Sequence, residues 1–357
     1  MRSVTIGRNQ AGQRLDKFLR KYLPNAGAGF IYKMLRKKNI TLNGKKAEGS
    51  ELLSVEDQVC FFFSDETLEK FSGQLFSEDQ NGGIQSFGHE HAEYAKAYQA
   101  LRKISVIYED DDILIADKPC GILTQKAHSG DLTLNEWLIG YLLEREPLLG
   151  QELASFHPSV CNRLDRNTSG LVLCGKSLAG LQSLSRCIQD RSIRKYYRTI
   201  CAGELTEPAV IRGYLTKNQT SNRVSVVQEP DFRKTGEHPS GDYIETAYKP
   251  IASQNGFTLL EVELITGKTH QIRAHLAGTG HPLIGDYKYG DAGINQKLKK
   301  KFGLQHHLLH ACRVVFPGQN TKAAPALESA WGKTFQAPCP ELFVCIQKGL
   351  DLVPKET

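Results

Sequence analysis

The sequence predicts an α+β protein in which a mixed, largely antiparallel β-sheet with flanking helices follows a smaller, helix-rich N-terminal domain. Short apolar segments typical of strands dominate from residue 104 onward, and no regular alternation of strand and helix appears among them. In residues 1–63, by contrast, apolar residues recur at helical spacing. With 357 residues, the chain is also long enough for two domains.

The composition is that of an ordinary globular protein. Hydrophobic residues make up 40% of the chain and charged residues 24%. No apolar segment approaches the roughly 20 residues that a membrane helix needs, and the start of the sequence lacks the apolar core of a signal peptide. The nine cysteines form no C-x-x-C pair, as expected for reduced thiols. We therefore expect a cytoplasmic protein without a membrane segment.

Residues 1–63 are expected to form the small N-terminal domain. The spacing of apolar residues predicts two helices, the first containing Leu15, Phe18 and Leu19 and the second Ile31, Met34 and Leu35. A strand over 40–42, a turn at Asn43-Gly44 and a strand over 59–63 are then expected to form a hairpin.

Positive charge is concentrated in this domain. Between residues 14 and 46 a single acid, Asp16, accompanies ten basic residues: Arg14, Lys17, Arg20, Lys21, Lys33, Arg36, Lys37, Lys38, Lys45 and Lys46. A lysine-rich helix often has only a solvated outer face, but here the basic residues extend over both helices and the hairpin. Clustered Lys and Arg side chains neutralise nucleic-acid phosphates, so a phosphate-binding surface is expected. Acids then predominate over 64–103, which predicts an acidic linker with a short helix near 94–101.

Residues 104–357 are expected to form the large domain. Two strands are predicted on either side of an acidic turn at 110–112, followed by a helix over 133–143 and a second helix capped by Ser177. Strands are expected at 196–202, 246–253 and 258–264, the last two joined by a turn at Asn255-Gly256. A helix over 269–276 comes next.

The loop before a predicted strand at 171–174 contains a candidate catalytic carboxylate. Its sequence is NRLDRNTSG, in which Asp165 lies between Arg163 and Arg166. Nearby positive charge favours the ionised form that a carboxylate nucleophile needs. An aspartate in a loop rich in Ser, Thr and Gly also commonly caps a turn, so that interpretation stays open.

Two further segments combine basic, aromatic and histidine residues. In SIRKYYRTICAG, interleaved Lys, Arg and Tyr residues are suited to hold phosphates and stack a base, although an exposed edge strand has a similar pattern. In GKTHQIRAHLAGTGHPLIGD, Lys268, His270, Arg273 and His275 lie near a helix start, which is a natural anion site. For a single histidine here a structural role is favoured, and Arg273 is the stronger candidate for a functional group.

Four blocks, in the same order, resemble the RluA-type pseudouridine synthase family. NRLDRNTSG is similar to its H-R-L-D-x-x-T-S-G signature, and KYYRTICAG is similar to its K-x-Y strand. GKTHQIRAHLAGTGHPLIGD resembles its G-R-x-H-Q-I-R-x-H block, and HLLHACRVVF resembles its late L-H-A strand. Asn162, Lys268 and Phe316 stand where the family usually has His, Arg and His. Residues 13–63 also resemble the S-four-type RNA-binding domain that often accompanies these enzymes.

The resemblance implies that the protein isomerises uridine in RNA to pseudouridine, with neither a cofactor nor a metal. It implies that Asp165 is the catalytic carboxylate, that Arg273 pairs with it, that Tyr197 stacks on the base and that Leu309 closes the floor of the pocket. The residues expected to contact the substrate nucleotide, which is turned out of the RNA, are Arg163, Arg166, Asn167 and Lys268. Large-subunit ribosomal RNA is the expected partner, and a monomer is the expected state.

Other interpretations remain open. Transfer RNA is an alternative substrate, and a non-catalytic RNA-binding ribosome-assembly protein is an alternative to the enzyme. A carboxylate-dependent hydrolase would need a second carboxylate near Asp165, where the sequence has arginines. A metal site formed by His306, His307, His310 and Cys312 is the last alternative. The resemblance places three of these four residues on a segment that the family uses as a strand without metal, so no metal is predicted.

Overall fold

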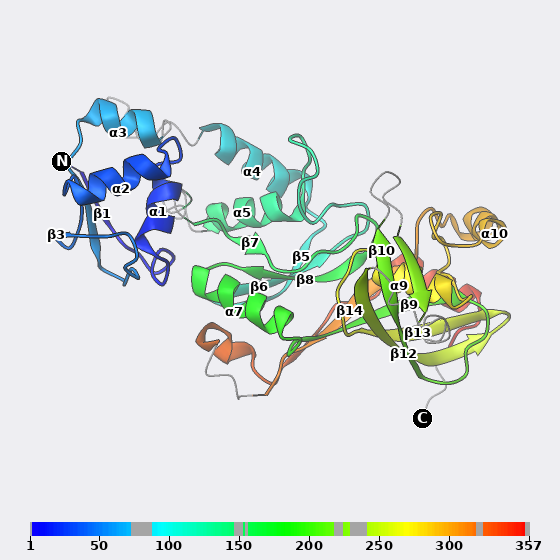
Figure 1. The fold of residues 1–357 in the computed structure, drawn as a ribbon. Coiled ribbons are helices and arrows are strands. Elements are labelled where there is room, and N and C mark those ends of the chain that lie inside the picture. Colours follow the sequence, from blue (N-terminus) through cyan, green and yellow to red (C-terminus); the bar gives the residue numbers. More distant parts are fainter. Residues whose placement is uncertain are drawn as a thin grey trace.

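The computed structural model describes residues 2–72, 88–145, 153, 156–217, 224–228, 241–318 and 324–353. These residues form an elongated molecule, with a small N-terminal sheet at one end and a large sheet running through the remainder (Figure 1). None of the helices in these ranges is long and apolar enough to cross a membrane.

The N-terminal domain is a four-stranded antiparallel sheet that packs against helices. Its elements are β1 (Arg2–Thr5), α1 (Leu15–Tyr22), α2 (Ala28–Arg36), β2 (Ile40–Leu42), β3 (Lys45–Lys46) and β4 (Gln58–Phe61). The strand order is β1-β4-β2-β3, and both predicted helices are confirmed. The core is aromatic: Phe18 stacks on Tyr22, and Tyr22 stacks on Phe61, with ring centroids 5.5 and 5.1 Å apart.

The predicted hairpin of this domain is wrong, because the turn at Asn43-Gly44 leads to a different strand from the one predicted. The turn at Asn43-Gly44 joins β2 to the two-residue strand β3, and β4 pairs with β2 only after a further loop. That loop is stabilised locally, because the carboxylate of Glu51 accepts hydrogen bonds from the backbone N–H groups of Glu48 and Gly49. The sequence also gave no indication of β1, a four-residue edge strand whose side chains are only partly buried.

The segment predicted as an acidic linker is helical and packed at both ends. Helix α3 (Asp65–Ser72) contributes Leu68 and Phe71 to the N-terminal core. Helix α4 (Gly88–Ala100) packs on a helix of the large domain, and its Tyr94 and Ala97 are buried. The acid-rich composition of this segment therefore did not reveal the apolar residues at helical spacing within it. Residues 73–87 lie outside the described residues.

The large domain is built on one eleven-stranded sheet. Its strands are β5 (Ser105–Glu109), β6 (Ile113–Lys118), β7 (Ser159–Val160), β8 (Ser169–Gly175), β9 (Arg194–Ala202), β10 (Ala209–Lys217), β11 (Val224–Gln228), β12 (Asp242–Gln254), β13 (Phe257–Leu264), β14 (Leu309–Val315) and β15 (Thr334–Gln336). The main strand order is β11-β10-β12-β13-β9-β14-β8-β6-β5. Only the pair of β14 and β8 is parallel among these described strands, which confirms the predicted mixed, largely antiparallel sheet.

Helices cover both faces of this sheet. They are α5 (Leu134–Arg145), α7 (Leu178–Gln189), α9 (Gln271–Gly278), α10 (Ala292–Phe302), a short 3-10 helix (Pro325–Ala330) and α11 (Glu341–Gly349). Alternate residues of β6 point to opposite faces, so Leu114 belongs to the core cluster that contains α5, while Ile113 belongs to the cluster that contains α7 and the 3-10 helix. Helices α10 and α11 pack behind β9 and β13 through Ile200 and Leu259.

The parallel contact between β8 and β14 depends on a glycine. Gly170 pairs with Ala311, and its φ of +110° lies in a region that residues with a Cβ rarely adopt. A Cβ added at this position would lie 2.2 Å from the carbonyl oxygen of Ala311. This close approach of two backbones brings the loop before β8 next to the start of β14.

Replacing Gly170 with alanine is expected to lower the free energy of unfolding by about 3 kcal/mol, because backbone strain and a clash with Ala311 add together. Urea denaturation measures this change. Gly256→Ala is the matched control: Gly256 also has a positive φ, +75°, but no atom lies within 4 Å of an added Cβ. Gly256→Ala should lower the free energy of unfolding by only about 1 kcal/mol. Equal losses in the two variants would show that the close approach contributes nothing.

Candidate active site

A cavity opens where the loop before β8 meets β9, β14 and the start of α9. Most of the residues predicted for the site line it: Asp165, Tyr197, Arg273, Arg163, Lys268 and Leu309. They come from several separate segments of the sequence, and two of them, Asp165 and Arg273, are 108 positions apart. The topology of the sheet therefore brings together groups that the sequence shows only in separate blocks.

The loop that carries Asp165 is fixed by hydrogen bonds on both sides. The amide oxygen of Asn162 accepts a 2.7 Å bond from the backbone N–H of Leu173 in β8. The hydroxyl of Thr124 donates to the carbonyl of Leu164 at 2.8 Å and accepts from its N–H at 3.1 Å. Within the loop, the N–H of Thr168 donates to the carbonyl of Asp165 at 3.0 Å. The backbone of Asp165 is thus held in place before any substrate binds.

A buried lysine ties this loop to the end of β6. Lys118 is fully buried, and its ammonium group donates to the backbone carbonyls of Ile122 at 2.8 Å, Pro119 at 3.1 Å and Arg166 at 3.2 Å. Burial lowers the pKa of Lys118 to about 8, while the nearby acidic groups oppose this shift. All three N–H donors are used, so Lys118 holds two loops together at the edge of the cavity.

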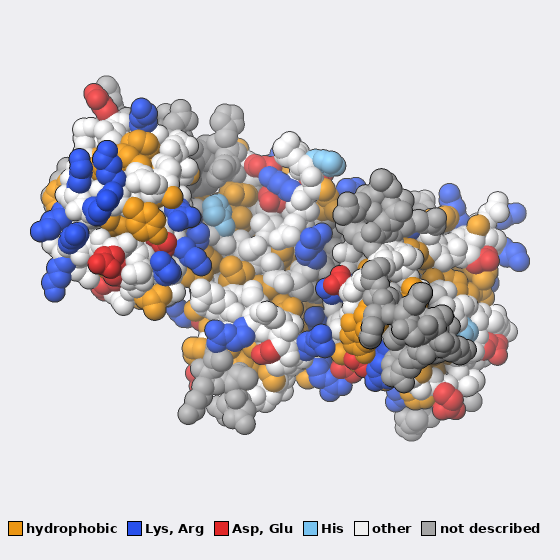
Figure 2. Space-filling model, viewed as in Figure 1, with side chains coloured by type: hydrophobic (Ala, Val, Ile, Leu, Met, Phe, Trp, Pro, Cys, Tyr) orange, Lys and Arg blue, Asp and Glu red, His pale blue; other side chains and the backbone are white. Residues whose placement is uncertain are grey.

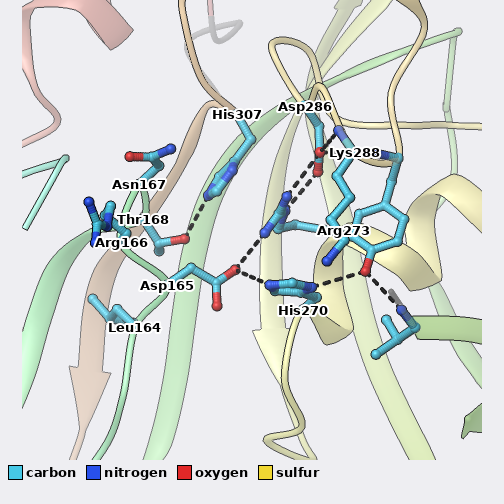
Figure 3. Close-up of polar contacts among 12 residues, drawn as sticks. Leu164, Asp165, Arg166, Asn167, Thr168, His270, Arg273, Asp286, Lys288 and His307 are labelled. Atoms are coloured by element: carbon cyan, nitrogen blue, oxygen red, sulfur yellow. Dashed lines mark hydrogen bonds and ion pairs between the residues drawn. The ribbon is translucent and has the colours of Figure 1, made fainter. Parts of the chain in front are cut away.

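Asp165 forms an ion pair with Arg273, as Figure 3 shows. One terminal nitrogen of Arg273 donates to Oδ2 of Asp165 at 2.8 Å. The remaining nitrogens face Asp286, with Nε donating to Oδ2 at 2.7 Å and Nη2 to Oδ1 at 3.0 Å. Burial alone would lower the pKa of Arg273, but the bonds and charges of Asp286 and Asp165 outweigh it and raise the pKa. Arg273 therefore stays charged between the two carboxylates.

Asp286 fixes the orientation of Arg273. It is 1% exposed, and its Oδ1 accepts the backbone N–H groups of Lys288 at 2.9 Å and Tyr289 at 3.1 Å. Its own carbonyl accepts the side-chain N–H of Asn295 in α10 at 2.9 Å. Burial alone would raise the pKa of Asp286, but the hydrogen bonds and charge of Arg273 lower it below the usual value. Asp286, the last residue of the block GKTHQIRAHLAGTGHPLIGD, thus supplies a charged partner for Arg273.

The two oxygens of Asp165 have different surroundings. Arg273 bonds to Oδ2, and Nε2 of His270 faces the same oxygen at 3.9 Å. Oδ1 has no hydrogen-bond or ion-pair partner among the residues that the structure describes. One oxygen is therefore held while the other is free to meet a ligand in the cavity.

Apolar side chains form another wall of the cavity. Tyr197 is 4% exposed in β9, and burial, with the charge of Asp165 as a further cause, raises the pKa of its phenol. Leu309 at the start of β14 and Leu164 lie beside it and are also buried. A planar, mostly apolar group such as a base is the kind of ligand that this wall fits.

The other predicted residues divide into two groups. Arg163 and Lys268 line the cavity, although Lys268 also pairs with the exposed carboxylate of Asp242 at 2.7 Å. Arg166 and Asn167 do not line it, and Figure 3 shows them on the opposite side of the loop from Arg273. The carbonyl of Asn167 instead accepts the thiol of Cys120 at 3.1 Å. Neighbouring positions in a turn point in different directions, so sequence proximity to Asp165 did not determine which side chains face the cavity.

Sequence reasoning missed His270 and Asp286 as members of the site. His270 was favoured as structural, yet its ring lines the cavity beside Asp165. The predicted helix over 269–276 begins only at Gln271, because His270 has left-handed backbone angles, φ 56° and ψ 17°. A positive φ at a residue other than glycine has no signal in a single sequence, and neither has the fold that brings Asp286 to Arg273.

The histidines and cysteine weighed as metal ligands have separate partners. His307 bonds to the hydroxyl of Thr168 at 2.9 Å, and His310 to the hydroxyl of Ser169 at 2.9 Å. Cys120 lies 3.3 Å from His306, whereas the thiol of Cys312 donates to a backbone carbonyl. Across the described ranges, no three His, Cys, Asp or Glu side chains are grouped as metal ligands.

Three comparisons bear on the class of this protein. A family model described as RNA pseudouridylate synthase matches residues 112–278. A ribosomal large subunit pseudouridine synthase C of Vibrio vulnificus is 29% identical over 93% of this chain and 94% of its own length. An uncharacterised RNA pseudouridine synthase of Mycoplasma genitalium is 28% identical over 90% of this chain and 91% of its own. The solved human RNA pseudouridylate synthase domain containing 4 has a TM-score of 0.56 at 20% identity, covering 74% of this chain and 100% of its own, which shows a shared fold.

The matches define an isomerase that acts on RNA. The chain is similar to the RNA pseudouridylate synthase family over residues 112–278, and the resemblance of its motifs to the RluA-type enzymes is confirmed. The matched residues include Asp165 and Arg273 together with the loop and helix that carry them.

Replacing Asp286 with alanine is expected to lower the free energy of unfolding by about 3–5 kcal/mol, because it leaves the buried Arg273 without its two-point partner. The effect should depend on pH. The folded pKa of Asp286 is depressed, so its stabilising effect is fully present above the unfolded value near 4 and is lost as pH falls through the folded pKa. Urea denaturation at several pH values measures the free energy of unfolding of both proteins. The difference between wild type and variant in this free energy should therefore become smaller at acidic pH.

Asp242→Ala is the control for this prediction. Asp242 also pairs with a cation, but its side chain is 57% exposed. An exposed ion pair contributes about 0–1 kcal/mol to the free energy of unfolding. The free energy of unfolding of this variant should therefore stay close to that of wild type at every pH. A loss at Asp286 no larger than that at Asp242 would contradict the role assigned to the buried pair.

Proposed function

We propose that this protein converts uridine to pseudouridine in large-subunit ribosomal RNA, with Asp165 as its catalytic carboxylate. The observation that carries the proposal is the arrangement around Asp165, which lines the cavity: Arg273 donates to Oδ2, while Oδ1 has no partner among the described residues. A carboxylate that is hydrogen-bonded to a fixed guanidinium is suited to act as a nucleophile or to stabilise positive charge on a sugar.

The reaction rearranges bonds within one nucleotide. The bond between N1 of uracil and C1′ of the ribose breaks, and Oδ1 of Asp165 attacks or stabilises C1′ as the base departs. The uracil then turns so that its C5 forms the new bond to C1′, and any bond between Oδ1 and C1′ breaks in the same step to return the free carboxylate. The proton on C5 is lost while N1 gains one. Because no atom is added and no electron is transferred overall, the reaction itself requires no redox partner.

The other cavity residues are proposed to hold the nucleotide. Tyr197 and Leu309 supply the buried wall against which the uracil stacks while it turns. Arg163 and Lys268 line the same cavity and are suited to pair with the phosphates on either side of the flipped nucleotide. Arg166 and Asn167, on the far side of the loop, are proposed to contact neighbouring RNA.

The N-terminal domain is proposed to bind RNA as an S-four-type module. Several basic side chains on α2 and the segment after it are exposed, among them Lys33, Arg36 and Lys37. Burial, together with the positive charge of Lys17, lowers the pKa of Lys21 in α1. Figure 2 shows Lys and Arg side chains gathered over the face of this domain, where few acids lie between them. An anionic chain passing over this face would relieve the repulsion.

The choice of substrate rests on the names of relatives. Pseudouridine synthases C of Vibrio vulnificus and D of Nitrosomonas europaea carry the description of ribosomal large subunit enzymes. Transfer RNA stays the alternative substrate. A non-catalytic assembly factor is disfavoured because Asp165, Arg273 and Tyr197 all face one cavity.

Asp165→Ala is expected to abolish pseudouridine formation while leaving RNA affinity largely intact. Unmodified large-subunit ribosomal RNA treated with each protein is examined by carbodiimide adducts and primer extension, which also locates the modified uridine. Asp190→Ala is the matched control, because Asp190 is exposed, does not line the cavity and accepts the backbone N–H of Ser192 in the turn after α7. Turnover by Asp165→Ala near the wild-type rate would refute the assignment. Modification by wild type of transfer RNA alone would change the substrate but not the catalytic residue.

A triple variant is expected to bind RNA more weakly and with a flatter salt dependence. It replaces Lys33, Arg36 and Lys37 with glutamine. Each lost phosphate contact reduces the slope of log affinity against log salt by about 0.7–0.9. The measurement is RNA affinity over a series of KCl concentrations, with thermal unfolding to verify the fold. An unchanged slope would exclude this face from the RNA interface.

A further inference from the structure

His270 adopts an unusual conformation beside Asp165. Its backbone angles, φ 56° and ψ 17°, are left-handed, which is uncommon for a residue other than glycine. Its carbonyl accepts the first hydrogen bond of α9, from the N–H of Ala274 at 2.9 Å, but its side chain does not cap the helix. The ring lies in the cavity instead. Strained backbone of this kind persists where the surrounding structure holds a side chain in a required position.

A tyrosine holds the other edge of this ring. Nδ1 of His270 lies 2.9 Å from the hydroxyl oxygen of Tyr289, and the two rings meet edge to face with centroids 5.7 Å apart. The same hydroxyl oxygen accepts the backbone N–H of Val224, the first residue of β11, at 3.1 Å. Because Val224 occupies one lone pair of the phenol oxygen, the O–H proton is available to donate to Nδ1. A neutral imidazole then carries its own proton on Nε2, the nitrogen that faces Asp165.

The charges around the ring favour this neutral form. Burial lowers the pKa of His270, and the positive charges of Arg273 and Lys288 lower it further, while Asp165 and Asp286 oppose the shift. These four charged groups, with the phenol of Tyr289, are the ionisable neighbours that face the ring. A neutral N–H donor orients a carboxylate without adding a second full positive charge, which would weaken its reactivity.

We propose that His270, held by Tyr289, is a positioning residue that presents Nε2–H to Oδ2 of Asp165 and so keeps Oδ1 directed at the ribose. This inference rests on the proposed function of Asp165. The present Nε2 to Oδ2 separation of 3.9 Å exceeds a hydrogen bond, and a small rotation of the carboxylate on substrate binding closes it. Arg273 supplies the positive charge beside the carboxylate. The chain of hydrogen bonds from Tyr289 through His270 to Asp165, here called the relay, supplies a second contact from another direction and so fixes the plane of the carboxylate.

The test uses the full-length protein and single-turnover kinetics on the RNA substrate, with RNA affinity measured separately. His270→Ala and Tyr289→Phe are each expected to lower the rate of pseudouridine formation by about 10- to 100-fold with little change in affinity, because the carboxylate is misaligned. His270→Gln should recover most of the rate, since its amide oxygen accepts from Tyr289 and its amide N–H donates to Asp165. Tyr287→Phe is the control, because Tyr287 is exposed and its hydroxyl donates to the carbonyl of Leu304 at 3.2 Å rather than to a residue that lines the cavity.

The pH profile separates positioning from a purely structural role. In the wild type, protonation of His270 at low pH turns the neutral donor into a cation, so the rate should fall as pH drops through its lowered pKa. The His270→Gln variant does not titrate there and should lose that part of the profile. An unaltered profile in His270→Gln, or a rate as low as that of His270→Ala, would overturn the proposal.

A second measurement addresses the tautomer directly. Spectra of the protein with ¹⁵N-labelled histidine, assigned with His270→Gln, should show a proton on Nε2 and none on Nδ1 at neutral pH. A proton on Nδ1 would overturn the relay. The kinetic outcomes also separate this inference from the function on which it rests: activity in Asp165→Ala refutes both, whereas an inactive Asp165→Ala alongside fully active His270→Ala and Tyr289→Phe refutes only the relay.

Discussion

The buried guanidinium of Arg273 is the constraint on which the rest of the site depends. An arginine that is only 7% exposed is tolerated only when opposite charges and hydrogen bonds surround it. Asp286 provides them at two points, and α10 holds Asp286 through Asn295. With two sides of the guanidinium occupied, one remaining nitrogen is aimed at Asp165. The carboxylate of Asp165 thus takes its orientation from a helix that does not itself line the cavity.

The sheet makes this arrangement possible. The parallel contact of β8 with β14 places the Asp165 loop beside Leu309, and the neighbouring strand β9 contributes Tyr197. Helix α9 then crosses the same face of the sheet and brings Arg273 and His270 to the cavity. Separate sequence blocks converge because central strands of one sheet, distant in the sequence, are neighbours in space.

The sequence predicted the fold class and most strands of the large domain, because apolar alternation and turn residues are local signals. It also indicated, through motif resemblance, the residues that line the cavity from both sides, Asp165 and Arg273. Local signals could not show that Arg166 faces away from the cavity, that Asp286 is the partner of Arg273, or that His270 has left-handed backbone angles. Each of these depends on contacts between segments remote in the sequence. The N-terminal hairpin was mispredicted for the opposite reason, since a strong local turn signal was joined to the wrong strand.

Asn162 stands where the related motif usually has a histidine, and the structure gives this difference a physical meaning. Its amide oxygen accepts the backbone N–H of Leu173 and so fastens the Asp165 loop to β8. An imidazole accepts such a bond only when it is neutral, whereas an amide has no ionisation in the range in which proteins are folded. The hydrogen bond from β8 to the loop is therefore insensitive to pH in this protein. The other attachment of the loop, from Lys118 to the carbonyl of Arg166, depends on an ammonium group whose pKa burial lowers to about 8, so the loop loosens on its Lys118 side as the pH rises through that value.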